Sequence, residues 1–139
     1  MRESSSMPAV AFFLDGEAAI SKLRALADSL LNSRPDVMKV YLFGSLAKGM
    51  HVPGSDADLL IVLGEDERRM VDRIPEYLRA FLDAPVPVDV FPLTKREIAD
   101  RMGRGDPFLQ RALDVGILLS GQGHLTNSGR EETLSEGNG

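Results

Sequence analysis

Hydrophobic residues follow two patterns along the chain, the spacing of amphipathic helices and the short runs of buried strands. Within residues 15–33, apolar side chains recur every three or four positions, which predicts a helix ended by Pro35. The runs 38–43 and 57–63 are short and almost wholly apolar, which predicts two buried strands. The helical stripe consists of Ala19, Leu23, Leu26 and Leu30.

A second helical stripe runs from Met70 to Leu82, but Pro75 is expected either to kink that helix or to mark the start of its main segment. Proline has no N–H to donate and clashes with the preceding turn. We therefore expect the firm part of this helix at 75–83, followed by a third strand at 86–91.

Two start signals mark helices in the next part of the chain. Thr94 and Glu97 have the spacing of a capping box, which opens a short helix reaching to about Met102. The dipeptide Asp106-Pro107 combines an N-cap residue with proline at the first helical position, so another helix is expected to begin there.

The chain is expected to form one domain. Gly116 is predicted to end the last helix as a left-handed cap before a short strand at 117–119. Alternation of helices and strands predicts an α/β fold, a small mixed sheet covered by helices. We expect an N-terminal segment at 1–14, the domain at 15–120, and a polar, glycine-rich, disordered tail at 121–139.

Composition narrows the classes of partner. The 139 residues include 16 basic and 21 acidic ones, a net charge of −5, which disfavours binding to extended nucleic acid. Without cysteine, any metal must be held by oxygen or histidine ligands. No apolar run is long enough for a membrane span and no secretion signal opens the chain, so a cytoplasmic protein is expected.

Asp56 and Asp58 are the first candidates for chemistry. They are two positions apart at the start of a predicted strand, so both carboxylates project to the same side. Two neighbouring anions repel each other unless they share a cation, and carboxylate oxygens favour Mg²⁺ or Mn²⁺. The pair therefore predicts a metal site, although such a pair taken alone is more often a solvated turn.

Asp89 is the third candidate. It interrupts a run of valines on the third strand and so points away from their face. If this strand neighbours the one that starts at Asp56, three carboxylates meet and two divalent ions can be held. Two such ions stabilise the attacking and leaving oxygens of an in-line displacement at phosphorus. The alternative is an edge-strand acid that faces solvent.

Gly44 and Ser45 directly follow the first strand. A glycine lets backbone N–H groups approach an anion and serine adds a hydroxyl donor, which suits a phosphate cradle. The loop is not a Walker motif, because no Gly-Lys-Ser/Thr follows at the required spacing. Gly44 is equally compatible with simple strand termination, and Ser45 with capping a turn.

The stretch 41–49, Tyr-Leu-Phe-Gly-Ser-Leu-Ala-Lys-Gly, followed by Ser-Asp-Ala-Asp-Leu-Leu-Ile-Val from Ser55, resembles the signature of the minimal nucleotidyltransferases of the DNA polymerase β superfamily. The resemblance covers about residues 15–120 and implies two Mg²⁺ ions, with Mn²⁺ as the alternative. Asp56 and Asp58 would bind both ions, and Asp89 would bind the catalytic one and help to deprotonate the acceptor hydroxyl. Gly44 and Ser45 would hold the β and γ phosphates of ATP.

Lys48 marks a departure from this family pattern. Many relatives carry arginine at its position and another at Leu46. Lysine keeps the charge at this nucleotide-binding position, but it lacks the planar fork that grips two phosphate oxygens, so weaker nucleotide affinity is expected.

Three functions fit the resemblance. The first is an antitoxin, an adenylyltransferase that moves AMP from ATP to a tyrosine of an all-helical HEPN-type toxin. The second is a self-contained or homo-oligomeric enzyme that adenylylates a small hydroxylated molecule. The third keeps the fold without catalysis, as a binding module.

Overall fold

The computed structural model describes residues 8–44, 47 and 56–121, with side chains from Gly16 onward. These residues form four helices and four strands that are mixed along the chain, as the hydrophobic pattern predicts. No helix in these ranges is long and apolar enough to cross a membrane. In chain order the elements are α1 (Pro8–Ser33), β1 (Val37–Phe43), β2 (Ala57–Leu63), α2 (Met70–Arg79), β3 (Val88–Thr94), α3 (Lys95–Gly103), α4 (Pro107–Val115) and β4 (Ile117–Gly121).

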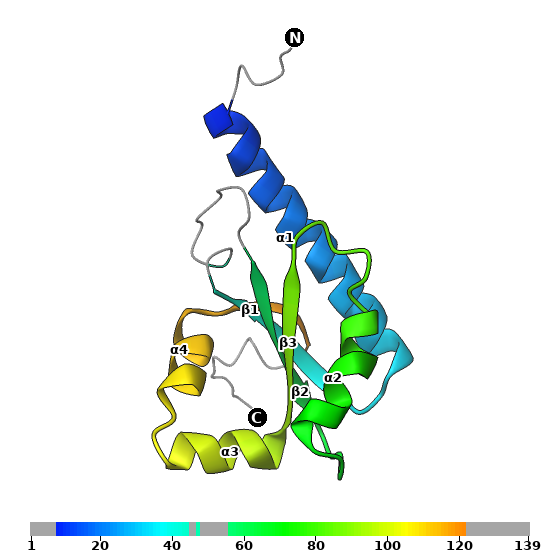
Figure 1. Ribbon diagram of the computed structural model, residues 1–139, viewed down its shortest axis with the longest axis vertical. Helices are drawn as coiled ribbons and strands as arrows, with labels where there is room; N and C mark the ends of the chain where they lie inside the picture. Colours follow the sequence, from blue (N-terminus) through cyan, green and yellow to red (C-terminus); the bar gives the residue numbers. More distant parts are fainter. Residues whose placement is uncertain (1–7, 45–46, 48–55, 122–139) are drawn as a thin grey trace, which may run out of the picture.

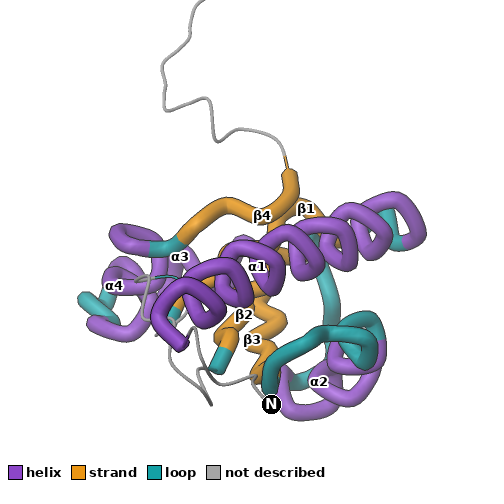
Figure 2. The backbone as a smooth tube through the Cα atoms, turned by 90° about the horizontal axis from the view of Figure 1, so that it is seen from above, coloured by secondary structure: helices purple, strands orange, loops and turns teal. Residues whose placement is uncertain are grey.

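The strands form one mixed sheet in the order β3-β2-β1-β4. Strand β1 is antiparallel to both β2 and β4, whereas β2 and β3 are parallel. Helices α3 and α4 lie on one side of the strands and α2 on the other (Figures 1 and 2). The predicted fold class, a small mixed sheet covered by helices, is therefore confirmed.

Each face of the sheet packs into its own hydrophobic core. On one face, α1 and α2 cover Val40, Leu42, Leu59 and Ile61. On the other face, residues of α3 and α4 cover a second cluster that contains Phe43, Leu60, Val62 and Leu93. Neighbouring strand residues alternate between the clusters because side chains alternate across a strand.

Helix α2 begins at Met70, five residues before the predicted start, and Pro75 lies inside it. The absent N–H of Pro75 removes a single helical hydrogen bond, to the carbonyl of Val71. Burial of Arg73 and Tyr77 on the inner side of the helix offsets this loss. Our prediction of a start at Pro75 was wrong because tertiary packing outweighs one missing bond.

Other boundaries also differ from the predictions. Helix α1 begins at Pro8 rather than at residue 15, and β3 spans Val88–Thr94 rather than 86–91. The strand continues through Pro92 because β3 is an edge strand, with only β2 to bond.

Gly116 is extended, with φ −72° and ψ 157°, so the predicted left-handed cap is wrong. Glycine is needed there for close approach, because a Cβ would lie 2.2 Å from the carbonyl oxygen of Ala112. The two predicted helix starts are confirmed: the capping box of Thr94 and Glu97 is formed, and Asp106 accepts N–H bonds at the start of α4.

Candidate active site

Strand register brings the predicted carboxylates to one end of the sheet. Asp58 is paired with Phe43 on β1 and with Asp89 on β3. Adjacent strands are about 4.8 Å apart, so Asp58 and Asp89 are direct neighbours on the same face. Asp56 lies immediately before β2, two residues from Asp58. The two strands are neighbours, which is the condition on which a three-carboxylate cluster depended, although Asp89 is the second residue of β3 rather than mid-strand.

Asp58 is the most enclosed of the three carboxylates. Burial raises its pKa, and the nearby charges of Asp89 and Asp56 raise it further. Asp56 and Asp89 are both exposed. None of the ion pairs formed within the described ranges involves these three residues. The cluster thus carries mutual repulsion that no protein cation in those ranges relieves.

Gly44 makes room for the Asp58 carboxylate. It adopts a positive φ of 90°, a conformation that glycine tolerates best. A Cβ on Gly44 would lie 2.6 Å from Oδ2 of Asp58. The glycine predicted as part of a phosphate cradle therefore also sets the position of a carboxylate. Ser45 and Lys48 lie outside the described residues.

The donor set suits a hard divalent cation, since all three side chains offer carboxylate oxygens. Within the described parts of the chain, no three His, Cys, Asp or Glu side chains already converge as a ligand set. Asp56 and Asp89 are exposed, so their side chains are free to adopt other rotamers.

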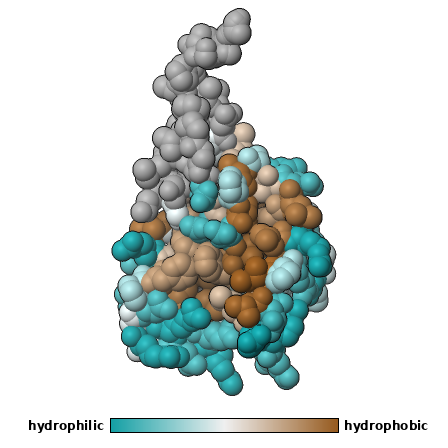
Figure 3. Space-filling view, viewed as in Figure 1, coloured by the Kyte–Doolittle hydropathy of each residue, from teal (hydrophilic) through white to brown (hydrophobic). Residues whose placement is uncertain are grey.

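An aromatic cluster, formed by Phe43, Phe91 and Phe108, lies next to the carboxylates on the same face of the sheet. Phe43 is paired with Asp58, and Phe91 follows Asp89 by two positions, so all four side chains share a face. Phe108 of α4 lies 5.2 Å from Phe43 and 5.1 Å from Phe91, measured between ring centroids. Hydrophobic side chains accordingly gather along β3 and beside it (Figure 3).

Sequence reasoning missed this aromatic cluster. Two-residue alternation from Asp89 could have placed Phe91 on the face of the carboxylates, but the contribution of α4 depends on tertiary packing.

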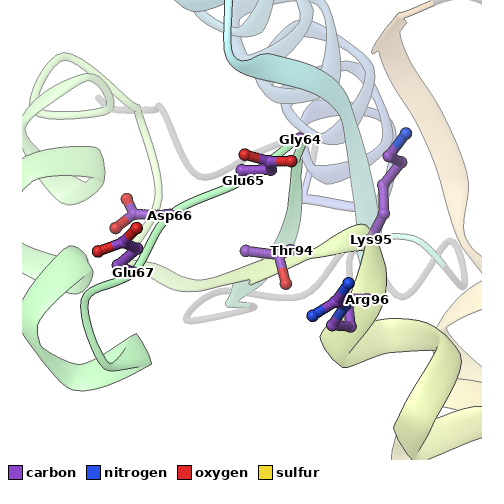
Figure 4. A pocket seen from close by; sticks show the side chains of 7 residues that line it. All are labelled: Gly64, Glu65, Asp66, Glu67, Thr94, Lys95 and Arg96. Carbon is purple, nitrogen blue, oxygen red and sulfur yellow. The ribbon is translucent and has the colours of Figure 1, made fainter.

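A separate hollow of about 440 Å³ lies at the opposite end of β2 and β3 (Figure 4). Its walls come from the segment after β2 and from the start of α3. It does not contain the predicted catalytic residues, so size alone does not identify the active site. The lining residues are Gly64, Glu65, Asp66, Glu67, Thr94, Lys95 and Arg96.

Beside this hollow, Arg73 is almost fully buried and holds several segments together. Its guanidinium donates to both carboxylate oxygens of Glu97, at 2.7 and 3.0 Å. It also donates to the backbone carbonyls of Pro92 and Asp66, at 3.0 and 2.9 Å, and to that of Arg68. Its Nε has no hydrogen-bond partner but lies 3.7 Å from an oxygen of Asp66. These contacts fix the segment after β2 against the start of α3.

Comparison with known proteins points to one family. Residues 23–117 match the family described as "Nucleotidyltransferase domain". A protein from Sulfolobus solfataricus of known structure, provisionally assigned as a nucleotidyltransferase, is similar in fold, with a TM-score of 0.57 at 20% identity. The alignment covers 87% of this chain and 94% of that protein. Comparison with curated proteins gave no significant match.

Proposed function

Since the chain belongs to the nucleotidyltransferase domain family, we propose that it transfers AMP from ATP to a hydroxyl group, with a tyrosine of a HEPN-type helical protein as the acceptor. The observation that carries this proposal is the pairing of Asp58 with Asp89 next to Asp56. Three neighbouring carboxylates without a protein cation are costly for a fold and useful for nucleotidyl transfer.

Each carboxylate has a task that its position supports. Asp56 and Asp58 would hold the divalent ions, and Asp89 would share one of them. Bound Mg²⁺ or Mn²⁺ would stabilise the attacking and leaving oxygens. Gly44, which lies beside the Asp58 carboxylate, would let backbone N–H groups approach the triphosphate.

The transfer is an in-line displacement at the α phosphorus of ATP. The acceptor oxygen forms a bond to this phosphorus while the bond to the bridging oxygen breaks, and pyrophosphate leaves. Asp89 is exposed and therefore accessible to the acceptor, whose proton it accepts.

Exposure of the site supports a protein acceptor. Asp56 and Asp89 are exposed, and Phe108 of the adjacent aromatic cluster is 37% exposed. Efficient transfer requires that water be kept from the activated phosphorus. A helical partner that covers the carboxylates and the aromatic cluster would exclude water and present its tyrosine at the same time. An antitoxin role follows if this modification silences a toxin.

The decisive experiment is co-expression with a HEPN-type partner encoded next to this chain, followed by intact-mass analysis. We expect an added AMP of about 329 Da on the partner, the mass set by loss of pyrophosphate from ATP. The adduct should vanish in the variant with both Asp56→Asn and Asp58→Asn. The matched control is Asp100→Asn, an exposed acid on α3, which should keep full modification.

Other outcomes would redirect the proposal. A bound but unmodified partner, with all carboxylates intact, would favour a binding module. Rapid adenylylation of a small hydroxylated compound by the protein alone would favour a self-contained enzyme.

A further inference from the structure

The outer side of α2 carries hydrophobic residues that belong to neither core. Val71, Leu78 and Leu82 are 56%, 37% and 75% exposed. Pro75 is exposed between them. On the opposite side of the helix, Arg73 and Tyr77 are buried. We call Val71, Pro75, Leu78 and Leu82 the α2 stripe.

The spacing of the α2 stripe is that of a helix-pairing seam. Intervals of four, three and four residues keep its members on one side of the helix. Leu82 follows the last helical residue, in a turn closed by its N–H bond to the carbonyl of Arg79. Helix α2 lies at the edge of the molecule (Figure 2), so a second helix has access to the stripe.

This spacing reads the same in both directions along the chain. If two copies pack with their α2 helices antiparallel about a two-fold axis, Val71 of each lies opposite Leu82 of the other. Pro75 of each then lies opposite Leu78 of the other. A two-fold interface requires such a self-complementary surface.

The charges beside the α2 stripe fit the same arrangement. Asp72 and Arg79 each follow a member of the stripe by one position, so both lie on the same flank. In the antiparallel pair, Asp72 of each copy lies two residues, about 3 Å along the axis, from the level of Arg79 of the other, which leaves room for two complementary contacts. Glu76 shares this flank but is already paired with two arginines of its own copy. Within one copy, the Asp72 carboxylate accepts a hydrogen bond from the guanidinium of Arg69 at 3.1 Å. Both side chains are exposed, so this pair contributes little to stability. None of the ion pairs within the described ranges uses Arg79.

From the symmetric spacing and the complementary charges, we propose that a second copy of this chain docks on the α2 stripe. The pairing leaves the carboxylates accessible, because α2 covers one face of the sheet while Asp58 and Asp89 lie on the other. A contact of about three helical turns is smaller than the roughly 800 Å² per partner of stable complexes. The dimer is therefore weak and dependent on concentration.

Charge exchange tests the pairing and its direction together. Asp72→Arg places a cation near Arg79 of the other copy, and Arg79→Asp places an anion near Asp72. Each variant alone should dimerise at least about tenfold more weakly than the wild type. An equal mixture of the two should recover dimers that contain one copy of each, because the mixed pair restores both contacts.

Sedimentation equilibrium from about 5 to about 500 µM covers the range of weak dimers. Leu82→Glu should also dimerise more weakly than the wild type. Because Leu82 is exposed, this variant should still fold, which circular dichroism checks. The control pair, Arg96→Asp and Asp100→Arg on α3, should dimerise as the wild type does, alone or mixed.

A wild-type protein that stays monomeric throughout this range would overturn the proposal. So would a dimer that Leu82→Glu leaves unchanged, or single charge variants that fail to recover association when mixed. A helical partner of another kind on the α2 stripe would show as a monomer whose binding to that partner is lost in Leu82→Glu. None of these results depends on catalysis.

Discussion

Strands β2 and β3 carry carboxylates at both ends, and the two ends differ in how these charges are balanced. Where the strands begin, burial and the neighbouring acids raise the pKa of Asp58. Beyond their other ends, a hydrogen bond from Arg68 lowers the pKa of Asp66 to about 2. Bonds from arginines likewise lower the pKa of Glu76 and Glu97. The arginine-balanced end holds the fold together, whereas the unbalanced end, around Asp58, is where we propose that an added cation binds.

The largest expected effect is at the arginine-balanced end. Arg73→Met keeps the length of the buried side chain but leaves Glu97 and three backbone carbonyls without their donor. Removing one partner of a buried pair costs about 3–5 kcal/mol, and the partial exposure of Glu97 favours the lower value. Urea unfolding measures this loss. Arg69→Met, at an exposed position, is the control and should change stability by less than about 0.5 kcal/mol.

Asp89→Asn addresses the unbalanced end and should affect chemistry more than binding. We expect transfer to fall about 100-fold, the scale on which a metal site responds to loss of a supporting group. ATP affinity should change much less, because Asp56 and Asp58 remain. Single-turnover kinetics and calorimetry separate the two effects. Full turnover in this variant would mean that another group accepts the proton.

Acid should weaken the arginine-balanced end. A carboxyl whose pKa is lowered by folding stabilises the protein above its unfolded pKa, and this contribution disappears as pH falls through the folded value. For Asp66 the window runs from about pH 4 down to about pH 2. Urea midpoints should therefore decrease across this window. The decrease should be smaller in Arg68→Met, which lacks the main cause of the shift, and unchanged in Arg69→Met.

The smallest expected effect is a gain in stability, whereas the preceding changes cause losses. Because folding raises the pKa of Asp58, its ionised side chain destabilises the fold at pH values above that raised pKa. Below the pKa of the unfolded state, the carboxyl is protonated in the folded and the unfolded protein alike, and this cost is absent. Without metal at pH 7, Asp58→Asn should raise stability by less than about 1 kcal/mol, since the side chain remains partly screened. At pH 3 the gain should disappear. Added Mg²⁺ should stabilise the wild type and not the variant, and thermal melts with and without Mg²⁺ measure both differences.

The sequence predicted most elements because local signals agree with the fold. The capping residues Thr94 and Asp106 and the apolar run at 57–63 are local signals, and each lies where it was expected. The start of α2 was not predictable from Pro75, because the packing of that helix outweighs one missing hydrogen bond.

The candidate site was predictable to a similar extent. The alternation of side chains along a strand predicted the face of the sheet on which Asp56, Asp58 and Asp89 lie. Only strand pairing shows that Asp58 and Asp89 are neighbours. Arg73 was missed because an arginine within a helical stripe normally faces water. Its burial depends on carbonyl groups contributed by distant segments.

Pro92 has a consequence for solubility. Strand β3 is an edge of the sheet, and an exposed edge offers unpaired N–H and carbonyl groups to any extended chain that approaches it. Pro92 sits within that edge, opposite Ile61 of β2, and has no N–H to offer. A strand from another molecule would find the hydrogen-bond ladder interrupted there, so edge-to-edge growth into fibrils is disfavoured while β3 still pairs with β2.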